Sequence, residues 1–236
     1  MIKLYKGDCL VEMNKIEDKS VDMILCDLPY GTTECEWDVA LSFDKLWEQY
    51  KRVIKDNGAI VLFAKQPFTS KLILSNEKMY KYNLIWKKDN HDNPLMAKKR
   101  FLNITEDIVV FYKKQCPYNP QGLVEYGKIT KQGATTKSLV QKNRRGSEVF
   151  QQYTNYPRNI LEFKRDFPMV HPTQKPVALL EYLIKTFTNE GALVLDNCMG
   201  SGSAGVAAKN LNRDFIGIEM TDKYYDIAKG RMNYND

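Results

Sequence analysis

Short apolar runs alternate with amphipathic stretches along most of this 236-residue chain. The apolar runs are too short for helices and rich in Val, Ile, Leu and Phe, as is typical of strands buried within a sheet. The stretches between them place apolar residues at helical spacing, and strands separated by helices favour a parallel sheet. Seven strands are predicted, at residues 2–6, 21–26, 59–63, 82–87, 108–112, 192–195 and 215–218.

The predicted helices occupy residues 10–16, 42–54, 68–74, 176–187, 203–210 and 222–232. Pro176 suits a first helical turn, because its missing N–H needs no partner there, and Thr221 suits an N-cap. The pattern as a whole predicts an α/β fold with a seven-stranded, mostly parallel, doubly wound sheet.

This alternation breaks after Tyr112. From residue 113 to about 165 the periodicity is weak and Gln, Asn, Thr, Gly and Tyr are frequent, which indicates an insertion rather than sheet core. We therefore predict one domain built from residues 1–113 and 166–236, interrupted by an insertion at residues 114–165.

Charge distinguishes the insertion from the rest of the chain. The sequence contains 35 Lys and Arg against 29 Asp and Glu, a net charge of +6. Residues 114–165 hold ten basic and three acidic residues, so this window is +7 and the remainder is −1. A compact basic segment beside a near-neutral body indicates a polyanionic partner such as nucleic acid, whereas a solvated basic loop is the alternative.

Composition narrows the class of protein further. Hydrophobic residues make up 43% and charged residues 27%, as in globular proteins. The five cysteines are odd in number and never in CxxC spacing, and there are two histidines, which argues against disulfides and structural zinc. The apolar runs are far shorter than a membrane span. We expect a soluble, cytoplasmic protein with no membrane partner.

A glycine-rich loop separates the predicted strand at 192–195 from the helix at 203–210. Gly200, Gly202 and Gly205 have GxGxxG spacing, and Glu219 ends the next strand, where a carboxylate can accept hydrogen bonds from ribose hydroxyls. Because strand, loop, helix and acid follow in the order that such sites use, the sequence predicts a nucleotide-like cofactor.

Asp196 distinguishes this loop from a dinucleotide site. It ends the strand, and three residues separate it from Gly200, whereas the dinucleotide fingerprint begins almost at the strand and places a pyrophosphate on the helix N-terminus. A carboxylate facing phosphate is unfavourable, but one beside an amino or sulfonium cation is favourable. A helix-capping or loop-structuring role is the alternative for Asp196.

The tetrapeptide Asp27-Leu28-Pro29-Tyr30 follows the second predicted strand, at the carboxyl edge where open parallel sheets bind ligands. Its chemistry suits an exocyclic amine, whose lone pair is delocalised into an aromatic ring. The Asp27 carboxylate and the Leu28 carbonyl can accept both amino hydrogens and direct the lone pair at an electrophile. Pro29 holds Leu28 extended, and Tyr30 offers a face for a base removed from its stack. An ordinary turn is the alternative.

The glycine loop and the tetrapeptide together resemble those of S-adenosylmethionine-dependent DNA amino-methyltransferases, which act on adenine N6 or cytosine N4. The usual tetrapeptide is Asp-Pro-Pro-Tyr, so Leu28 departs from it at a position expected to act through its backbone. In that family Asp27 favours adenine, whereas Ser would favour cytosine. The run from His171 to Pro176 (His-Pro-Thr-Gln-Lys-Pro) resembles motif X, and this order of motifs implies the circularly permuted β class.

The resemblance implies S-adenosylmethionine as cofactor, with no metal. Within it, Asp8 would meet the cofactor adenine, with an N-cap as the alternative, and Lys175 would contact the methionine carboxylate, with a solvated side chain as the alternative. The implied cofactor-binding residues are Asp8, Cys9, Asp27, Thr173, Lys175, Asp196, Gly200, Gly202, Ser203 and Glu219.

The β-class order also places target recognition in the basic insertion. Its densest basic point contains Lys142, Arg144 and Arg145, which we expect to hold the phosphates of double-stranded DNA. The run from Lys98 to Arg100 is a second candidate for contact with the DNA backbone, and an exposed hairpin loop is the alternative. A site-specific adenine-N6 methyltransferase of a restriction-modification type is the function implied.

Alternatives to this function remain open at the level of sequence. They are a cytosine-N4 methyltransferase, an enzyme acting on RNA bases or a protein amide, and a nicotinamide-dependent oxidoreductase. The sequence also leaves a homodimer open.

Overall fold

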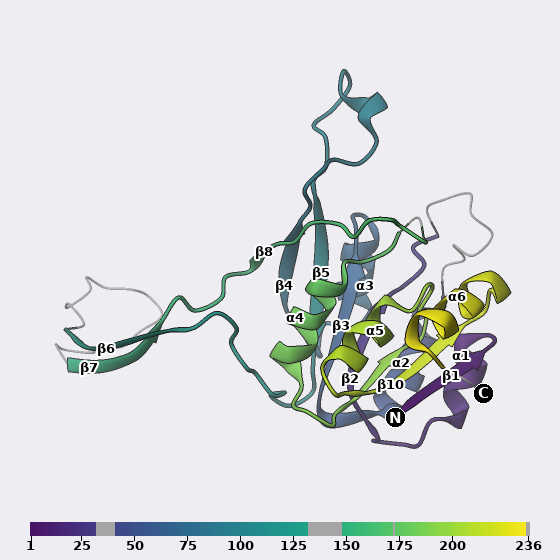
Figure 1. Ribbon diagram of the computed structural model, residues 1–236, viewed down its shortest axis with the longest axis horizontal. Coiled ribbons are helices and arrows are strands. Elements are labelled where there is room, and N and C mark those ends of the chain that lie inside the picture. Colours follow the sequence, from purple (N-terminus) through teal and green to yellow (C-terminus); the bar gives the residue numbers. More distant parts are fainter. Residues whose placement is uncertain (32–40, 132–147, 172, 235–236) are drawn as a thin grey trace. The chain divides into compact units, whose positions relative to one another are not determined.

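The computed structural model describes residues 1–31, 41–131, 148–171 and 173–234 (Figure 1). The chain divides into two compact units, one formed by Met1–Asn119 with Asn159–Asp236 and the other by Pro120–Arg158. The larger unit contains the sheet and its helices. The smaller contains a two-stranded antiparallel sheet of β6 (Val124–Lys131) and β7 (Glu148–Thr154).

The sheet of the larger unit has eight strands and is mostly parallel, and in its described part only β5 runs antiparallel to its neighbours. All seven predicted strands are present. In spatial order the strands are β1 (Ile2–Lys6), β10 (Asp214–Glu219), β9 (Leu193–Asp196), β2 (Val21–Asp27), β3 (Ile54–Ala64), β5 (Thr105–Phe111), β4 (Tyr80–Lys87) and β8 (Ile160–Glu162).

Helices cover both faces of this sheet, as Figure 1 shows. Strand β2 is therefore apolar along almost its whole length, and Met23 and Ile24 point into different cores. One core packs α4 (Val177–Phe187), α5 (Ser203–Asn210) and α6 (Asp222–Met232) against the sheet. The other packs α1 (Cys9–Glu12), η1 (Met13–Lys15), α2 (Phe43–Val53) and α3 (Phe68–Ser75).

The structure differs from the sequence expectation at the ends of the insertion. Residues 114–119 and 159–165 belong to the larger unit, where Asn119 N donates to Thr186 O at 2.8 Å and Trp86 Nε1 donates to Phe163 O at 2.9 Å. Strand β8 lies in this stretch and adds an eighth strand beside β4. Three residues are too few to produce a periodic signal, so the sequence pattern misses it.

One helix prediction also needs correction, because the helix predicted at 10–16 is a single α-helical turn followed by a 3-10 turn. Thr221 is the N-cap of α6, as predicted, although its side chain makes no cap hydrogen bond. Among the residues described, no helix has the length and apolar character needed to cross a membrane.

The direction in which successive strands are added across the sheet reverses between β9 and β2. These neighbours are parallel, but β9 continues through α5 to β10 on one side, while β2 continues through α2 to β3 on the other. Their carboxyl ends, Asp196 and Asp27, therefore lie beside the crevice that forms where two helical connections diverge. This topology brings together two motifs that are far apart in the sequence.

Gly202, which precedes α5, allows the loop after β9 to approach α6 closely. It has a φ of +77°, and a Cβ there would lie 2.9 Å from both Ala228 Cβ and Met232 Cε. Gly191 has a similar φ of +75°, but a Cβ there would meet nothing within 4 Å. A substitution of Gly191 by Ala therefore measures the cost of the left-handed backbone without the cost of overlap.

We expect Gly202→Ala to reduce the free energy of unfolding by about 2–5 kcal/mol, because it adds core overlap to backbone strain. Gly191→Ala carries the strain alone and should cost about 1–2 kcal/mol. Urea denaturation followed by circular dichroism measures both. Equal losses of unfolding free energy in the two variants would mean that α6 shifts to accommodate the added Cβ at no energetic cost.

Candidate active site

A cavity of about 610 Å³ lies at the carboxyl ends of β2 and β9. Four segments that are distant in sequence meet in its wall: the N-terminal turn, the tetrapeptide after β2, the segment before α4 and the glycine loop. The residues proposed from sequence that line it are Asp8, Cys9, Asp27, Leu28, Pro29, Tyr30, Thr173, Lys175, Asp196, Gly200, Ser203 and Glu219.

Gly202 does not line this cavity, because its Cα faces α6. In the structure it packs closely against α6, and its assignment as a cofactor-binding residue stays a prediction. Lys142, Arg144 and Arg145 lie outside the described residues.

Both carboxylate oxygens of Asp27 accept a hydrogen bond inside the cavity. Tyr30 Oη donates to Oδ1 at 2.9 Å, and Lys175 Nζ donates to Oδ2 at 2.5 Å. Burial raises the pKa of Asp27 above its ordinary value, and the positive charge of Lys175 opposes that rise. Each oxygen retains a second lone pair, so the carboxylate can still accept hydrogen bonds from a ligand.

Lys175 is 8% exposed, which excludes the alternative of a solvated side chain. Its Nζ lies 2.9 Å from Glu106 Oε1 as well as against Asp27. Burial acts to lower the pKa of Lys175, but the two carboxylates outweigh it and hold the pKa above its usual range. The lysine therefore carries its charge inside the cavity wall.

Glu106, on β5, is a site residue that sequence reasoning missed. It is 7% exposed and accepts from Lys175, from Lys88 Nζ at 3.0 Å and from Tyr30 Oη at 3.3 Å. Burial acts to raise its pKa, but the two lysines outweigh burial and hold the pKa below its usual range. Nothing in the local sequence marks it, because a single acid near a strand start is a common pattern.

The ion pairs extend beyond Glu106 along the cavity wall. Lys88 Nζ lies 3.3 Å from Asp92 Oδ2, and Lys65 Nζ lies 2.7 Å from the same oxygen. Positive and negative groups thus alternate from Asp27 through Lys175, Glu106, Lys88 and Asp92 to Lys65. All of these residues line the cavity.

Carboxylates also shape the glycine-loop side of the cavity. Glu219 Oε2 accepts from Gly200 N at 2.9 Å, while its Oε1 accepts from Thr221 N at 2.8 Å. Asp196 Oδ1 accepts from Cys198 N at 3.1 Å, so the loop-structuring role proposed as an alternative is present. Burial raises the pKa of Asp196 to about 7. Burial therefore disfavours the ionised form of this acid.

Asp8 serves as the N-cap of α1, since its Oδ1 accepts from Leu10 N at 2.7 Å. This is the alternative weighed for it, although the residue also lines the cavity. His171 packs its ring 4.1 Å from that of Tyr224, measured between centroids, and burial with nearby Lys175 lowers its pKa to about 4. The histidine is therefore neutral near pH 7.

The arrangement of a hydrogen-bonded Asp27 tetrapeptide opposite an acidic glycine loop defines a class of protein. A profile of the DNA methylase family matches residues 21–230, so the chain belongs to this family of N6 and N4 methyltransferases. The resemblance seen in the motifs is thereby confirmed, and the nicotinamide-dependent alternative is set aside.

Individual relatives resemble the chain over nearly its whole length. It is 29% identical to the DNA adenine methyltransferase YhdJ of Escherichia coli K12, covering 98% of this chain and 82% of that protein. It is 28% identical to the type II methyltransferase M.HpaI of Haemophilus parainfluenzae, covering 98% and 74% respectively.

Solved structures share the fold. A complex of M1.HpyAVI with SAM has a TM-score of 0.68 and 27% identity, covering 99% of this chain and 100% of that one. The cytosine-N4-specific PvuII DNA methyltransferase has a TM-score of 0.73, covering 100% of this chain and 86% of that one, at 15% identity. The second likeness is one of fold alone.

The pKa of Asp196 predicts how stability changes with pH. The carboxyl titrates near 3.8 ordinarily and near 7 in the folded protein, so the folded state binds this proton more tightly. Its stabilising contribution is present below about pH 4 and is lost as the pH rises towards 7, by at most about 1.4 kcal/mol per pH unit.

Asp196→Asn keeps a neutral group at every pH and should remove this loss. The difference in unfolding free energy between the variant and the wild type should therefore move in the variant's favour from about pH 4 to pH 7. Urea denaturation at several pH values without cofactor measures it. A difference that stays constant with pH would contradict the assignment.

Proposed function

We propose that this protein transfers a methyl group from S-adenosylmethionine to the exocyclic N6 of an adenine in double-stranded DNA. The observation that carries the proposal is the placement of the Asp27 tetrapeptide and the acidic glycine loop in one cavity. The names of two relatives support it, since one is a DNA adenine methyltransferase and one was solved with SAM.

The residues on the glycine-loop side fit this cofactor. Asp196 is a carboxyl whose pKa is raised by burial, and a sulfonium or amino group nearby would favour its ionised form. Glu219 has lone pairs left for ribose hydroxyls, and we keep Asp8, which lines the cavity, as the proposed contact for the adenine. When bound, S-adenosylmethionine supplies an electrophilic methyl group. In the described part of the chain, no cluster of His, Cys, Asp or Glu is arranged for a metal ion.

On the other side of the cavity, Asp27 and Leu28 would bind the target amine. The Asp27 carboxylate has one free lone pair on each oxygen, and the Leu28 carbonyl can accept the second amino hydrogen. Binding both hydrogens favours a pyramidal nitrogen whose lone pair points at the methyl group. As that nitrogen gains positive charge, an ionised Asp27 beside it stabilises the transition state.

Tyr30 is held rigidly enough to act as a platform for the base. Its hydroxyl is bonded to Asp27, and its ring lies 4.9 Å from that of Phe68 between centroids. A base can reach this ring only after it leaves its stack, because an intact DNA duplex is too wide to enter the cavity. Asp27 rather than Ser at the head of the tetrapeptide favours adenine over cytosine.

The Pro120–Arg158 unit is our candidate for sequence recognition. Its described residues include exposed aromatic and basic side chains, among them Tyr126, Lys128 and Phe150, and Lys128 Nζ lies 5.2 Å from the centre of the Tyr126 ring. Cations interleaved with aromatic rings suit phosphates and bases together. We keep Lys142, Arg144 and Arg145 as proposed phosphate contacts.

Asp27→Asn should lower methyl transfer at least about 100-fold, because the amide loses the negative charge that stabilises the transition state. Binding of S-adenosylmethionine, measured by calorimetry, should change less than about threefold. Incubation of mixed DNA with labelled cofactor, followed by nucleoside digestion and mass spectrometry, measures the product. Wild-type protein should yield N6-methyladenine. Label in cytosine would contradict the base assignment, and label absent from DNA would contradict the substrate class.

Glu106→Gln should reveal a positioning role that acts through Lys175. Removing this negative charge lowers the pKa of Asp27, so the acid limb of kcat/KM should move to lower pH, with kcat reduced about tenfold. Glu162→Gln is the matched control, because Glu162 is an exposed acid bonded to Lys87 and does not line the cavity. A pH profile unchanged by Glu106→Gln would contradict this role.

A further inference from the structure

The loop of residues 89–104 joins β4 to β5 at the edge of the sheet that carries the active site. Strand β4 runs parallel to β3 and β2, because both β4 and β3 are antiparallel to β5. The end of β4 therefore lies at the same edge as Asp27. Figure 1 shows this loop extending beyond the ends of β4 and β5.

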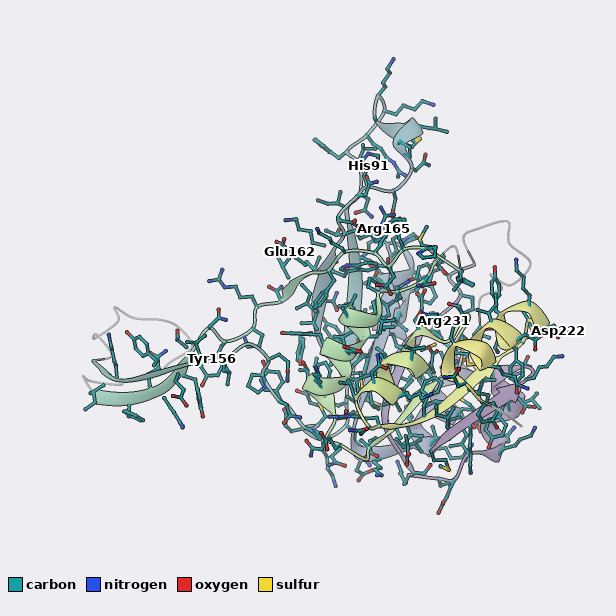
Figure 2. All side chains as sticks on the ribbon, in the orientation of Figure 1. His91, Tyr156, Glu162, Arg165, Asp222 and Arg231 are labelled. Carbon is teal, nitrogen blue, oxygen red and sulfur yellow. The ribbon has the colours of Figure 1, made fainter. Side chains whose placement is uncertain are left out.

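The base of this loop is fixed to the cavity wall. Lys88 N donates to Ile104 O at 2.8 Å, and Asp92 N donates to Asn103 O at 2.9 Å, so the two sides are paired. Asp92 is ion-paired with Lys88 and Lys65 inside the cavity. Arg165 Nε also bonds Asp89 Oδ1 at 3.2 Å, and Figure 2 shows Arg165 beneath the loop.

The tip of the loop presents apolar side chains to water. Phe101 is 100% exposed and Leu95 is 87% exposed. Between them lies the run from Lys98 to Arg100, which is exposed throughout, and residues 93–104 contain no acid. A pair of large apolar groups flanking three cations is unfavourable in water and fits an apolar slot bordered by negative charge.

We propose that the tip enters the DNA duplex beside the target base, with Phe101 inserted between bases and the run from Lys98 to Arg100 against the phosphates. This inference rests on the proposed function and deepens it. A base that leaves its stack leaves a gap in the duplex, and opening that gap costs free energy. An apolar side chain inserted between base steps stabilises the opened duplex. Because the loop base is tied to the residues around Asp27, the wedge acts next to the cavity that receives the base.

Phe101→Ala should weaken methylation of intact duplex more than methylation of a duplex that is already open. After sequencing of methylated DNA has mapped the site, two duplexes are compared, one with the adenine paired to thymine and one with it opposite an abasic position. We expect a loss of about 10- to 100-fold on the first and less than about threefold on the second. Leu74→Ala, which truncates an exposed apolar residue on α3, is the control and should change neither.

The basic run gives a second, independent measurement. Replacing Lys98, Lys99 and Arg100 together by Ala should reduce the slope of log affinity against log salt by about 2–3, as expected for three lost phosphate contacts. Lys71→Ala with Lys78→Ala, two exposed lysines on and after α3, should leave the slope unchanged.

Three results would overturn the wedge. One is equal activity of Phe101→Ala and wild type on paired duplex. Another is an equal loss on both duplexes, which would indicate damage to the cavity rather than to base opening. The third is a molecular mass of Phe101→Ala in light scattering that differs from that of the wild type, which would make the tip a contact between copies of this chain. If wild-type protein methylates neither duplex, the proposed function itself fails, and the wedge fails with it.

Discussion

A buried ammonium shared between two carboxylates organises the candidate active site. Lys175 Nζ contacts Asp27 on β2 and Glu106 on β5 from a segment that precedes α4. Removing such a charge from water is costly unless several acceptors surround it. Because the acceptors come from different strands, the arrangement forms only when the sheet and the segment before α4 are assembled together. The position of the Asp27 carboxylate is therefore a consequence of the whole fold rather than of its own loop.

The same ion pairs suit the chemistry proposed for Asp27. Alternating charges keep this wall of the cavity close to neutral, so no single carboxylate is left buried without a partner. The positive charge of Lys175 favours the ionised form of Asp27, and in the proposed reaction this negative charge acts when the amine becomes cationic. A low-dielectric cavity strengthens that interaction and needs little rearrangement during the reaction.

Sequence patterns predicted the sheet core, the tetrapeptide and the glycine loop, because each produces a local signal of periodicity or spacing. Glu106 escaped because its importance arises from neighbours on other segments, and strand β8 escaped because three residues give no period. Gly202 belonged to a recognisable spacing, but the spacing did not show that a side chain there would overlap α6. Spacing identifies the turn that a loop needs, whereas the packing of that loop against a distant helix depends on the assembled fold.

The two parts of the chain proposed to bind DNA differ in how they are supported. The loop of residues 89–104 shares Lys88 and Asp92 with the ion pairs around Glu106, so its base cannot shift without disturbing the groups that hold Asp27. Such coupling suits a task that depends on accurate placement beside the cavity. The Pro120–Arg158 unit forms its own small sheet instead. A separate unit can change its surface without altering the catalytic wall, which suits the reading of a particular DNA sequence.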